Sequence, residues 1–294
     1  MKRHRSLYGL IVLMVTLWAA NFIVAKVALR EFPPLLLSGL RVALAGVFIL
    51  PVYCWRHREK PDRWTREDLP LLLYLGLFGV ALNQLFFVLG LSRTTVAHSS
   101  FILSLTPILV LLIAGTMKME TVTPRKLAGM AVAAGGVAVL KAFEGAPVEG
   151  AGPTWLGDGL ILLGGLTFAL FTVFGKRATL RHNSITINTF AYVGGAVALS
   201  PLVFWQAGGF SFARVSPAGW LALVYMALFP SVVCYLIYYY ALTRIAASRV
   251  SAFSYLQPPL ATALSALLLG EHVTLPVVLG GAVIFSGVYL AERG

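Results

Sequence analysis

The feature that most constrains this chain is a series of apolar segments, each about as long as a bilayer is thick. A membrane helix needs about 20 apolar residues, and ten segments satisfy this: residues 7–28, 33–54, 69–91, 95–116, 124–141, 157–178, 184–205, 217–242, 249–269 and 274–291. Hydrophobic residues make up 59% of the 294 residues and charged residues 12%, which is too apolar for a soluble fold of this size. The sequence therefore predicts an all-α integral membrane protein with ten transmembrane helices.

The chain also repeats itself at a spacing of 151 residues. Pro107 and Glu120 lie 151 residues before Pro258 and Glu271, in two apolar segments that both begin with small hydroxyl residues. We therefore expect two halves of five helices each, residues 1–143 and 144–294. Because five is an odd number, the second half must enter the membrane in the opposite sense, and inverted repeats of this kind enclose a central cavity.

The basic residues predict how the chain is oriented. If the N-terminus is cytoplasmic, seventeen of the 23 Lys and Arg residues fall on the cytoplasmic side and four on the outer side, with Lys26 and Arg41 inside predicted helices. Loops rich in Lys and Arg stay in the cytoplasm, so we expect both termini there. We attribute the net charge of +12 to this orientation and not to nucleic-acid binding. Cys54 and Cys234 lie in or beside apolar segments and predict no disulfide framework.

These residues resemble the EamA-like repeat of the drug/metabolite transporter superfamily. That repeat has a Trp-rich first helix ending in a lysine, an arginine in the second helix, a small-residue fourth helix with a proline, and a Gly-Glu pair before a Gly-rich fifth helix. The first half supplies Trp18, Asn21, Phe22, Lys26, Arg41, Ser99, Ser100, Pro107, Glu120, Gly129, Gly135 and Gly136, and the second half supplies Phe168, Lys176, Pro258, Gly270, Glu271, Gly280 and Gly287.

The resemblance covers nearly the whole chain, with three departures. Phe168 replaces the tryptophan of the second half, Ala191 stands in the place of Arg41, and Met119 replaces a glycine. The resemblance implies ten helices around a cavity in a transporter of amino acids, related metabolites or toxic organic compounds.

Polar and aromatic residues in the middle of the predicted helices are the candidate substrate contacts. An unpaired polar group in lipid is costly, so we expect these side chains to face a cavity. The candidates are Trp18, Asn21, Asn83, Gln84, Phe87, Ser100, Ser104, Phe168, Tyr235, Tyr238, Ser251, Ser254 and Tyr255. The alternative is that the hydroxyl groups bond back to their own helices and that the aromatic side chains pack in the core. Pro107 and Pro258 are expected to break their helices and to free carbonyl groups for a ligand.

Three basic residues are candidates for gating or charge recognition. Arg41 lies about eight residues into its helix, and no Asp or Glu occupies the middle of any predicted helix. Carbonyl groups, water or an anionic substrate must therefore hold it, either as a structural clasp or as a substrate or gating contact. Lys26 lies close enough to the outer helix end to extend its amine to the surface. His98, at the outer start of its helix, is either a proton relay or a surface residue.

The leading hypothesis is a secondary transporter of the bacterial inner membrane that exports amino acids or related small metabolites by alternating access. The sequence has no phosphate-binding glycine loop for ATP and no arrangement of catalytic groups for an intramembrane enzyme. We expect no cofactor, no metal and no nucleic acid. The expected partners are a small-molecule substrate and the lipid bilayer, and the chain could act as a monomer. The alternatives are a multidrug or organic-cation exporter and a channel or scramblase.

Overall fold

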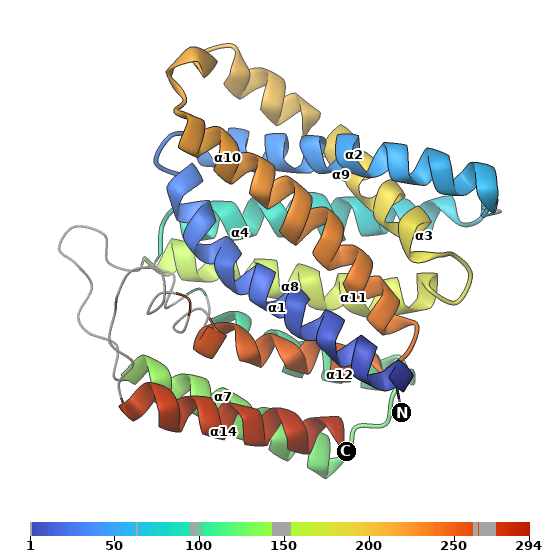
Figure 1. Ribbon diagram of the computed structural model, residues 1–294, viewed down its shortest axis with the longest axis vertical. Coiled ribbons are helices and arrows are strands. Elements are labelled where there is room, and N and C mark those ends of the chain that lie inside the picture. The colour runs from blue at the N-terminus through green and yellow to red at the C-terminus, as the bar shows by residue number, and fades with distance from the viewer. Residues whose placement is uncertain are drawn as a thin grey trace.

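The computed structural model describes residues 2–62, 64–94, 99, 102–142, 154–260, 264 and 275–294, and these form helices and no strand (Figure 1). The α-helices are α1 (Lys2–Ala28), α2 (Pro34–Glu59), α3 (Leu69–Tyr74), α4 (Asn83–Leu91), α6 (Thr106–Thr116), α7 (Pro124–Ala142), α8 (Trp155–Ala178), α9 (Ser184–Ala207), α10 (Pro217–Met226), α11 (Cys234–Leu242), α12 (Ala247–Ala252) and α14 (Leu275–Glu292). Two π-helical segments, η1 (Leu75–Leu82) and η3 (Ala227–Val233), and two short 3₁₀ helices, η2 (Phe212–Arg214) and η4 (Phe253–Leu256), lie between them. The predicted all-helical fold is confirmed.

Six helices of the described part are long and apolar enough to cross a membrane. They are Ser6–Ala28, Pro34–Glu59, Leu69–Leu91, Trp155–Ala178, Ser184–Ala207 and Pro217–Leu242. Thr106–Thr116 and Val278–Ala291 are shorter apolar helices. All of them overlap segments that were predicted from their apolar length.

Local sequence signals explain where several helices begin. Proline stands at the start of α2, α7 and α10, where its missing amide hydrogen is not needed. Three starts, among them that of α10, carry a capping side chain that accepts a hydrogen bond from a backbone amide of the first turn. The caps are Thr154 for α8, Asn183 for α9 and Ser216 for α10.

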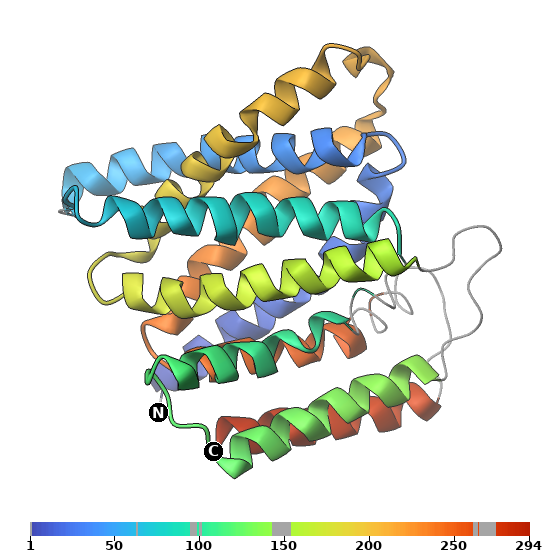
Figure 2. The same ribbon diagram turned by 180° about the vertical axis from the view of Figure 1, so that it is seen from behind.

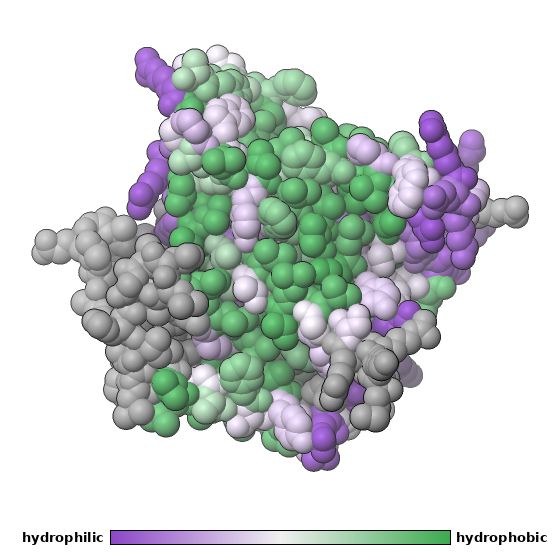
Figure 3. Space-filling model, viewed as in Figure 1, coloured by the Kyte–Doolittle hydropathy of each residue, from purple (hydrophilic) through white to green (hydrophobic). Residues whose placement is uncertain are grey.

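The surface is apolar along the sides of the helices and hydrophilic at their ends (Figure 3). Large side chains such as Phe204 and Trp205 are 77% and 71% exposed, which suits contact with lipid. Figure 1 and Figure 2 show both termini at the same end of the helix bundle.

Two long helices contain a π-helical segment in the middle, which the sequence analysis did not predict. In Leu69–Leu91 the segment is η1, whose glycines let other helices approach closely. A side chain on Gly79 would meet the ring of Phe171 at 1.8 Å, and one on Gly76 would meet the Ala191 carbonyl at 3.2 Å. In Pro217–Leu242 the segment is η3, which contains Pro230. The η3 segment therefore occurs where a proline disfavours an ordinary α-helix.

Helices α7 and α14 pack against each other through glycines. A Cβ atom on Gly129 would lie 2.4 Å from the Ala291 backbone nitrogen, and one on Gly287 would lie 2.4 Å from the Ala133 nitrogen. The contact is reciprocal, because each glycine also faces the carbonyl of the other. Small residues let two membrane helices approach to backbone contact, which explains why both repeats carry glycine here.

Candidate binding cavity

A cavity lies between α1, α4, α8 and α11, with an empty volume of about 740 Å³ counted together with the open space at its mouth. Ten of the residues selected from the sequence line it: Trp18, Asn21, Arg41, Asn83, Gln84, Phe87, Ser104, Phe168, Tyr235 and Ser254. Five further residues line it that were not selected as substrate contacts, although Phe22 was named for the family resemblance; they are Phe22, Leu103, Thr106, Gly164 and Gln257.

Aromatic side chains form one wall of the cavity around Trp18. The Trp18 ring meets Phe168 edge-on at 5.8 Å and Tyr235 at 6.0 Å between centroids. Its indole nitrogen donates a hydrogen bond to the Pro230 carbonyl at 3.1 Å, so the ring is held in place. Phe22 and Phe87 make a further T-shaped pair at 5.5 Å.

A group of polar side chains holds α4 against its neighbours. The Asn83 side-chain amide donates to the Gly164 carbonyl of α8 at 2.9 Å. Gln84 donates to the Tyr235 hydroxyl at 3.3 Å, and that hydroxyl donates to Asn83 Oδ1 at 3.5 Å. An unpaired polar group is costly in the low-dielectric interior of a protein, and these hydrogen bonds pair the buried polar groups. They also fix the positions of the side chains on the polar side of the cavity.

Arg41 is held by carbonyl and hydroxyl oxygens, one of the arrangements that the sequence left open. Its Nε donates to the Met226 carbonyl at 3.2 Å and to Ser231 Oγ at 3.0 Å. Pro230, four residues later, has no amide hydrogen to donate to the Met226 carbonyl, which also accepts a hydrogen bond from the Ser231 hydroxyl at 2.8 Å. The proline in the middle of the helix was the sequence signal for this contact, although the sequence analysis did not select it.

The two prolines that were expected to break helices stand beside the cavity. Pro107 lies in the first turn of α6, directly after a turn at residues 104–105. Pro258 follows η4, and residues 257–260 are helical again. Each irregular segment contributes residues to the cavity: Ser104 and Thr106 beside Pro107, and Ser254 and Gln257 beside Pro258.

Four other selected residues do not line the cavity. Tyr238 is buried against the Trp18 ring, and its hydroxyl forms a hydrogen bond with the Thr172 hydroxyl at 2.7 Å. Ser251 donates back to the Ser248 carbonyl at 3.0 Å, which is the alternative that the sequence left open for hydroxyl groups. Tyr255 is buried.

Lys26 does not extend to the surface as expected. Instead, its ammonium donates hydrogen bonds to the Leu91 and Thr94 carbonyls at 2.6 and 2.9 Å. His98 and Ser100 lie outside the described residues.

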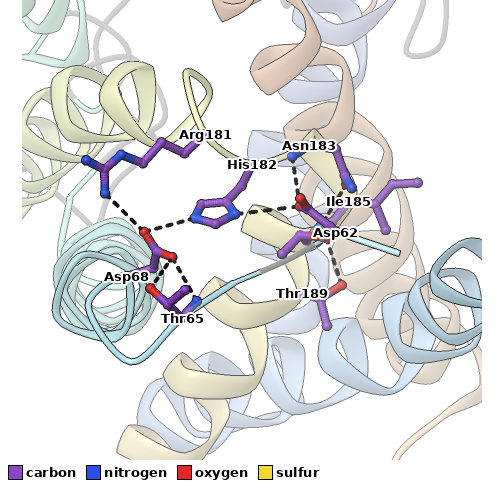
Figure 4. A network of polar contacts seen from close by, with 9 residues as sticks. Asp62, Thr65, Asp68, Arg181, His182, Asn183, Ile185 and Thr189 are labelled. Carbon is purple, nitrogen blue, oxygen red and sulfur yellow. Dashed lines mark hydrogen bonds and ion pairs between the residues drawn. The ribbon is translucent and has the colours of Figure 1, made fainter. Parts of the chain in front are cut away.

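A second polar group, which the sequence analysis missed, joins the α2–α3 connection to the α8–α9 turn (Figure 4). His182 Nε2 lies 3.3 Å from Asp68 and its Nδ1 lies 3.7 Å from Asp62. The Thr65 backbone amide donates to Asp68, and this bond, with His182 beside it, lowers the pKa of Asp68 to about 2. The group ties two connections together at one end of the bundle.

The turn between α1 and α2 makes a comparable contact with the start of α10. Glu31 accepts hydrogen bonds from the hydroxyl and the backbone amide of Ser216, and both bonds lower the pKa of Glu31. In the part of the chain that the structure describes, no cluster of three or more His, Cys, Asp and Glu residues could hold a metal ion.

Comparison with known proteins gives concordant results. A sequence model of the EamA-like transporter family matches residues 5–141 and 155–292. An uncharacterized transporter of Archaeoglobus fulgidus is 31% identical over 284 residues, which are 96% of this chain and 95% of that protein. A probable terminal-alkyne amino-acid exporter of Streptantibioticus cattleyicolor is 27% identical over 297 residues, 100% of this chain and 95% of that one. A crystal structure with 18% sequence identity shares the fold, with a TM-score of 0.77 over 98% of this chain and 97% of the other.

Proposed function

Since the chain belongs to the EamA-like transporter family of membrane transporters, we propose that it is a secondary transporter of the bacterial inner membrane that exports amino acids or related small metabolites. The observation that carries this proposal is the cavity at the centre of the bundle, where an aromatic wall and a few buried polar groups face one another. Pockets of this composition bind small amphipathic molecules.

The proposed architecture is ten transmembrane helices in two inverted repeats, residues 1–143 and 144–294, with both termini in the cytoplasm. Three observations support it. The family model matches the chain twice, once in each half. The termini lie at the same end of the bundle (Figure 1), as an even number of passes requires. The Lys and Arg residues are concentrated in the loops assigned to the cytoplasm.

In the proposed mechanism the two halves alternate between packings that open the cavity to one side or the other. Pro107 and Pro258 stand at irregular segments on the cavity, so backbone distortion is concentrated where the halves meet. The relative named as an amino-acid exporter supports an amino-acid substrate. The lining contains no Asp or Glu among the described residues, which favours a substrate other than a polycation.

An organic-cation exporter is the second candidate, because aromatic faces such as that of Trp18 also attract cations. Arg41 opposes this alternative, since its guanidinium carries a positive charge on the cavity.

The proposal is tested by counterflow into liposomes that contain the purified protein. We expect saturable, trans-stimulated uptake of labelled apolar amino acids, and a rate roughly 5-fold lower for Trp18→Ala, since an aromatic contact with substrate contributes about 1 kcal/mol. Trp205→Ala is the matched control, because Trp205 is 71% exposed on the outside of the bundle.

Two results would count against the proposal. A parent protein that moves no member of a panel of amino acids and aromatic amines is not this transporter. Uptake of aromatic amines that amino acids do not inhibit would favour the cation exporter.

A further inference from the structure

Two side chains of the first half bind the backbone in and beside the π-helical segment η3 of the second half. Arg41 of α2 binds at the start of η3, where its Nε donates to the Met226 carbonyl at 3.2 Å and to Ser231 Oγ at 3.0 Å. Trp18 of α1 binds in the middle, where its indole nitrogen donates to the Pro230 carbonyl at 3.1 Å. This short stretch of backbone therefore connects a buried arginine to an aromatic ring on the cavity.

The proline makes this stretch depend on side chains. In an α-helix the amide four residues later would bind the Met226 carbonyl, but Pro230 has no amide hydrogen. The Ser231 hydroxyl, at 2.8 Å, and Arg41 Nε bind that carbonyl instead. Because Arg41 also binds the Ser231 hydroxyl, it ties the two ends of the turn together from the side of α2. The direction of the Pro230 carbonyl, which holds the Trp18 indole, depends on this tie.

The other half of the molecule lacks every member of this arrangement. At the repeat spacings of 150 and 151 residues, the counterparts of Arg41, Trp18, Pro230 and Ser231 are Ala191, Phe168, Gly79 and Val80. None of these counterparts has a side-chain hydrogen-bond donor or a proline ring. The segment η1 packs through its glycine instead, since a Cβ atom on Gly79 would lie 1.8 Å from the Phe171 ring. Four departures from the repeat that share one set of hydrogen bonds indicate a single functional unit.

We propose that Arg41 is a positioning residue for Trp18: by holding η3 it fixes the Pro230 carbonyl, and that carbonyl fixes the indole ring on the cavity. The inference rests on the proposed function for the role of Trp18 as a substrate contact, and it adds the residue that places this side chain. Arg41 is 2% exposed, so it affects a bound substrate through Trp18 and not by direct contact.

The first test observes Trp18 without any substrate. Protein labelled with 15N-tryptophan contains six indole N–H groups, and Trp18→Phe identifies the NMR resonance of Trp18 by its loss. Arg41→Met should shift or broaden this resonance and leave the other five in place. Arg41→Lys keeps a charged donor and should restore part of the parent signal. Ser231→Ala removes one of the two acceptors of Arg41 and should cause a smaller shift.

The second test measures KM and the maximal rate for counterflow of labelled L-phenylalanine. Trp18→Phe keeps a ring and removes the N–H group, and a lost hydrogen bond weakens binding by about 2- to 10-fold, so KM should rise by that factor. Arg41→Met should raise KM by a similar factor with little change in the maximal rate. The double variant should show no further increase, because both changes remove the same placement of the ring.

Arg30→Gln is the matched control for both tests, because Arg30 is an exposed arginine in the α1–α2 turn. It should leave the Trp18 resonance and KM as they are in the parent. If Arg41→Met does not elute as a monodisperse protein, Arg41→Lys and Ser231→Ala serve in its place, with the same expected directions.

The outcomes separate this inference from the proposed function. A Trp18 resonance that is unchanged in the Arg41 and Ser231 variants would show that Arg41 does not position the indole. Multiplied KM effects in the double variant would show that Arg41 acts independently of Trp18, and the inference is then wrong while the transporter stands. If the parent transports no amino acid and the Trp18 resonance still responds to Arg41→Met, the proposed function fails and the positioning of Trp18 stands.

Discussion

The turn after α1 and the turn after α8 lie at opposite ends of the bundle (Figure 1), and they begin in the same way. At the first, Lys26 donates to the carbonyls of Leu91 and Thr94. At the second, Lys176 donates to the carbonyls of Leu242 and Ile245. In both places an ammonium binds the last carbonyls of the neighbouring helix, where the helix dipole is negative.

The two turns differ in the location of the acidic residue that each contact contains. At the first turn the acid is Glu31 on the turn itself, and its partner is Ser216 at the start of α10. At the second turn Arg181 occupies the corresponding position, 150 residues after Glu31, and the acid is Asp68, across the contact at the start of α3. The repeated sequence therefore preserves the two lysine contacts, whereas the acidic residue lies on the turn in one half and on the opposing helix start in the other.

The largest effect is expected where the two turns are alike. Lys26→Met and Lys176→Met should each destabilise the protein by about 1–3 kcal/mol, because each leaves two helix-end carbonyls without a charged donor. Thermal unfolding in detergent, followed by tryptophan fluorescence, measures the loss. Lys60→Met, at an exposed position, is the control. A loss in one variant and not the other would break the equivalence of the two turns.

A smaller effect should reveal the difference between the turns. Glu31→Gln and Asp68→Asn should each lower the melting temperature by about 2–4 °C, with the larger decrease for Asp68→Asn. Asp68 contacts Thr65, Arg181 and His182, whereas Glu31 contacts Ser216. The double variant should show the sum of the two decreases, because the sites are far apart. The reverse order would show that the histidine contact adds nothing.

Acid should weaken the second turn over a defined pH range. The pKa of Asp68 is lowered from 3.8 to about 2, so its contribution to stability is complete above about pH 4 and is lost as the pH falls towards about 2. The pKa of Glu31 is lowered too, by Ser216, and its contribution has the same sign. Melting temperatures recorded from pH 5 to 2 should therefore decrease less steeply for Asp68→Asn than for the parent, and identical slopes would contradict this.

The smallest effect belongs to Arg181, whose contact with Asp68 is at the edge of the network. Its side chain is 70% exposed and its Nη1 lies 3.4 Å from Asp68. An exposed ion pair contributes about 0–1 kcal/mol and is screened by salt. Arg181→Gln should therefore lower the melting temperature slightly at low salt and not at about 1 M salt. A decrease that persists in high salt would assign Arg181 a role beyond this pair.

Apolar length and proline position predicted the helices well. The predicted segments 69–91 and 217–242 coincide with two continuous helices of the structure. Length alone decides whether a segment can cross a bilayer, and proline at the first turn costs no hydrogen bond, so both signals are local. The order and approximate ends of the helices follow from them.

The details of the cavity were harder to predict, because they depend on contacts between helices. Polarity at mid-helix selected Asn83 and Gln84, but Gly164 and Gln257 carried no comparable signal. Lys26 was expected at the surface, since the sequence does not show that two carbonyls lie within its reach. The partner of Arg41 depended on Pro230, 189 residues away in the chain.

The π-helical segments η1 and η3 change which way the second part of each helix points. A π turn contains about one residue more than an α turn, and one residue corresponds to about 100° of rotation around the axis. Everything beyond η1, including Asn83 and Gln84, is therefore rotated relative to an uninterrupted helix that starts at Leu69. Deleting one residue from η1 would allow an ordinary α-helix in which these two amides still face Gly164 and Tyr235. A helical wheel drawn through the whole present segment assigns them to the wrong side.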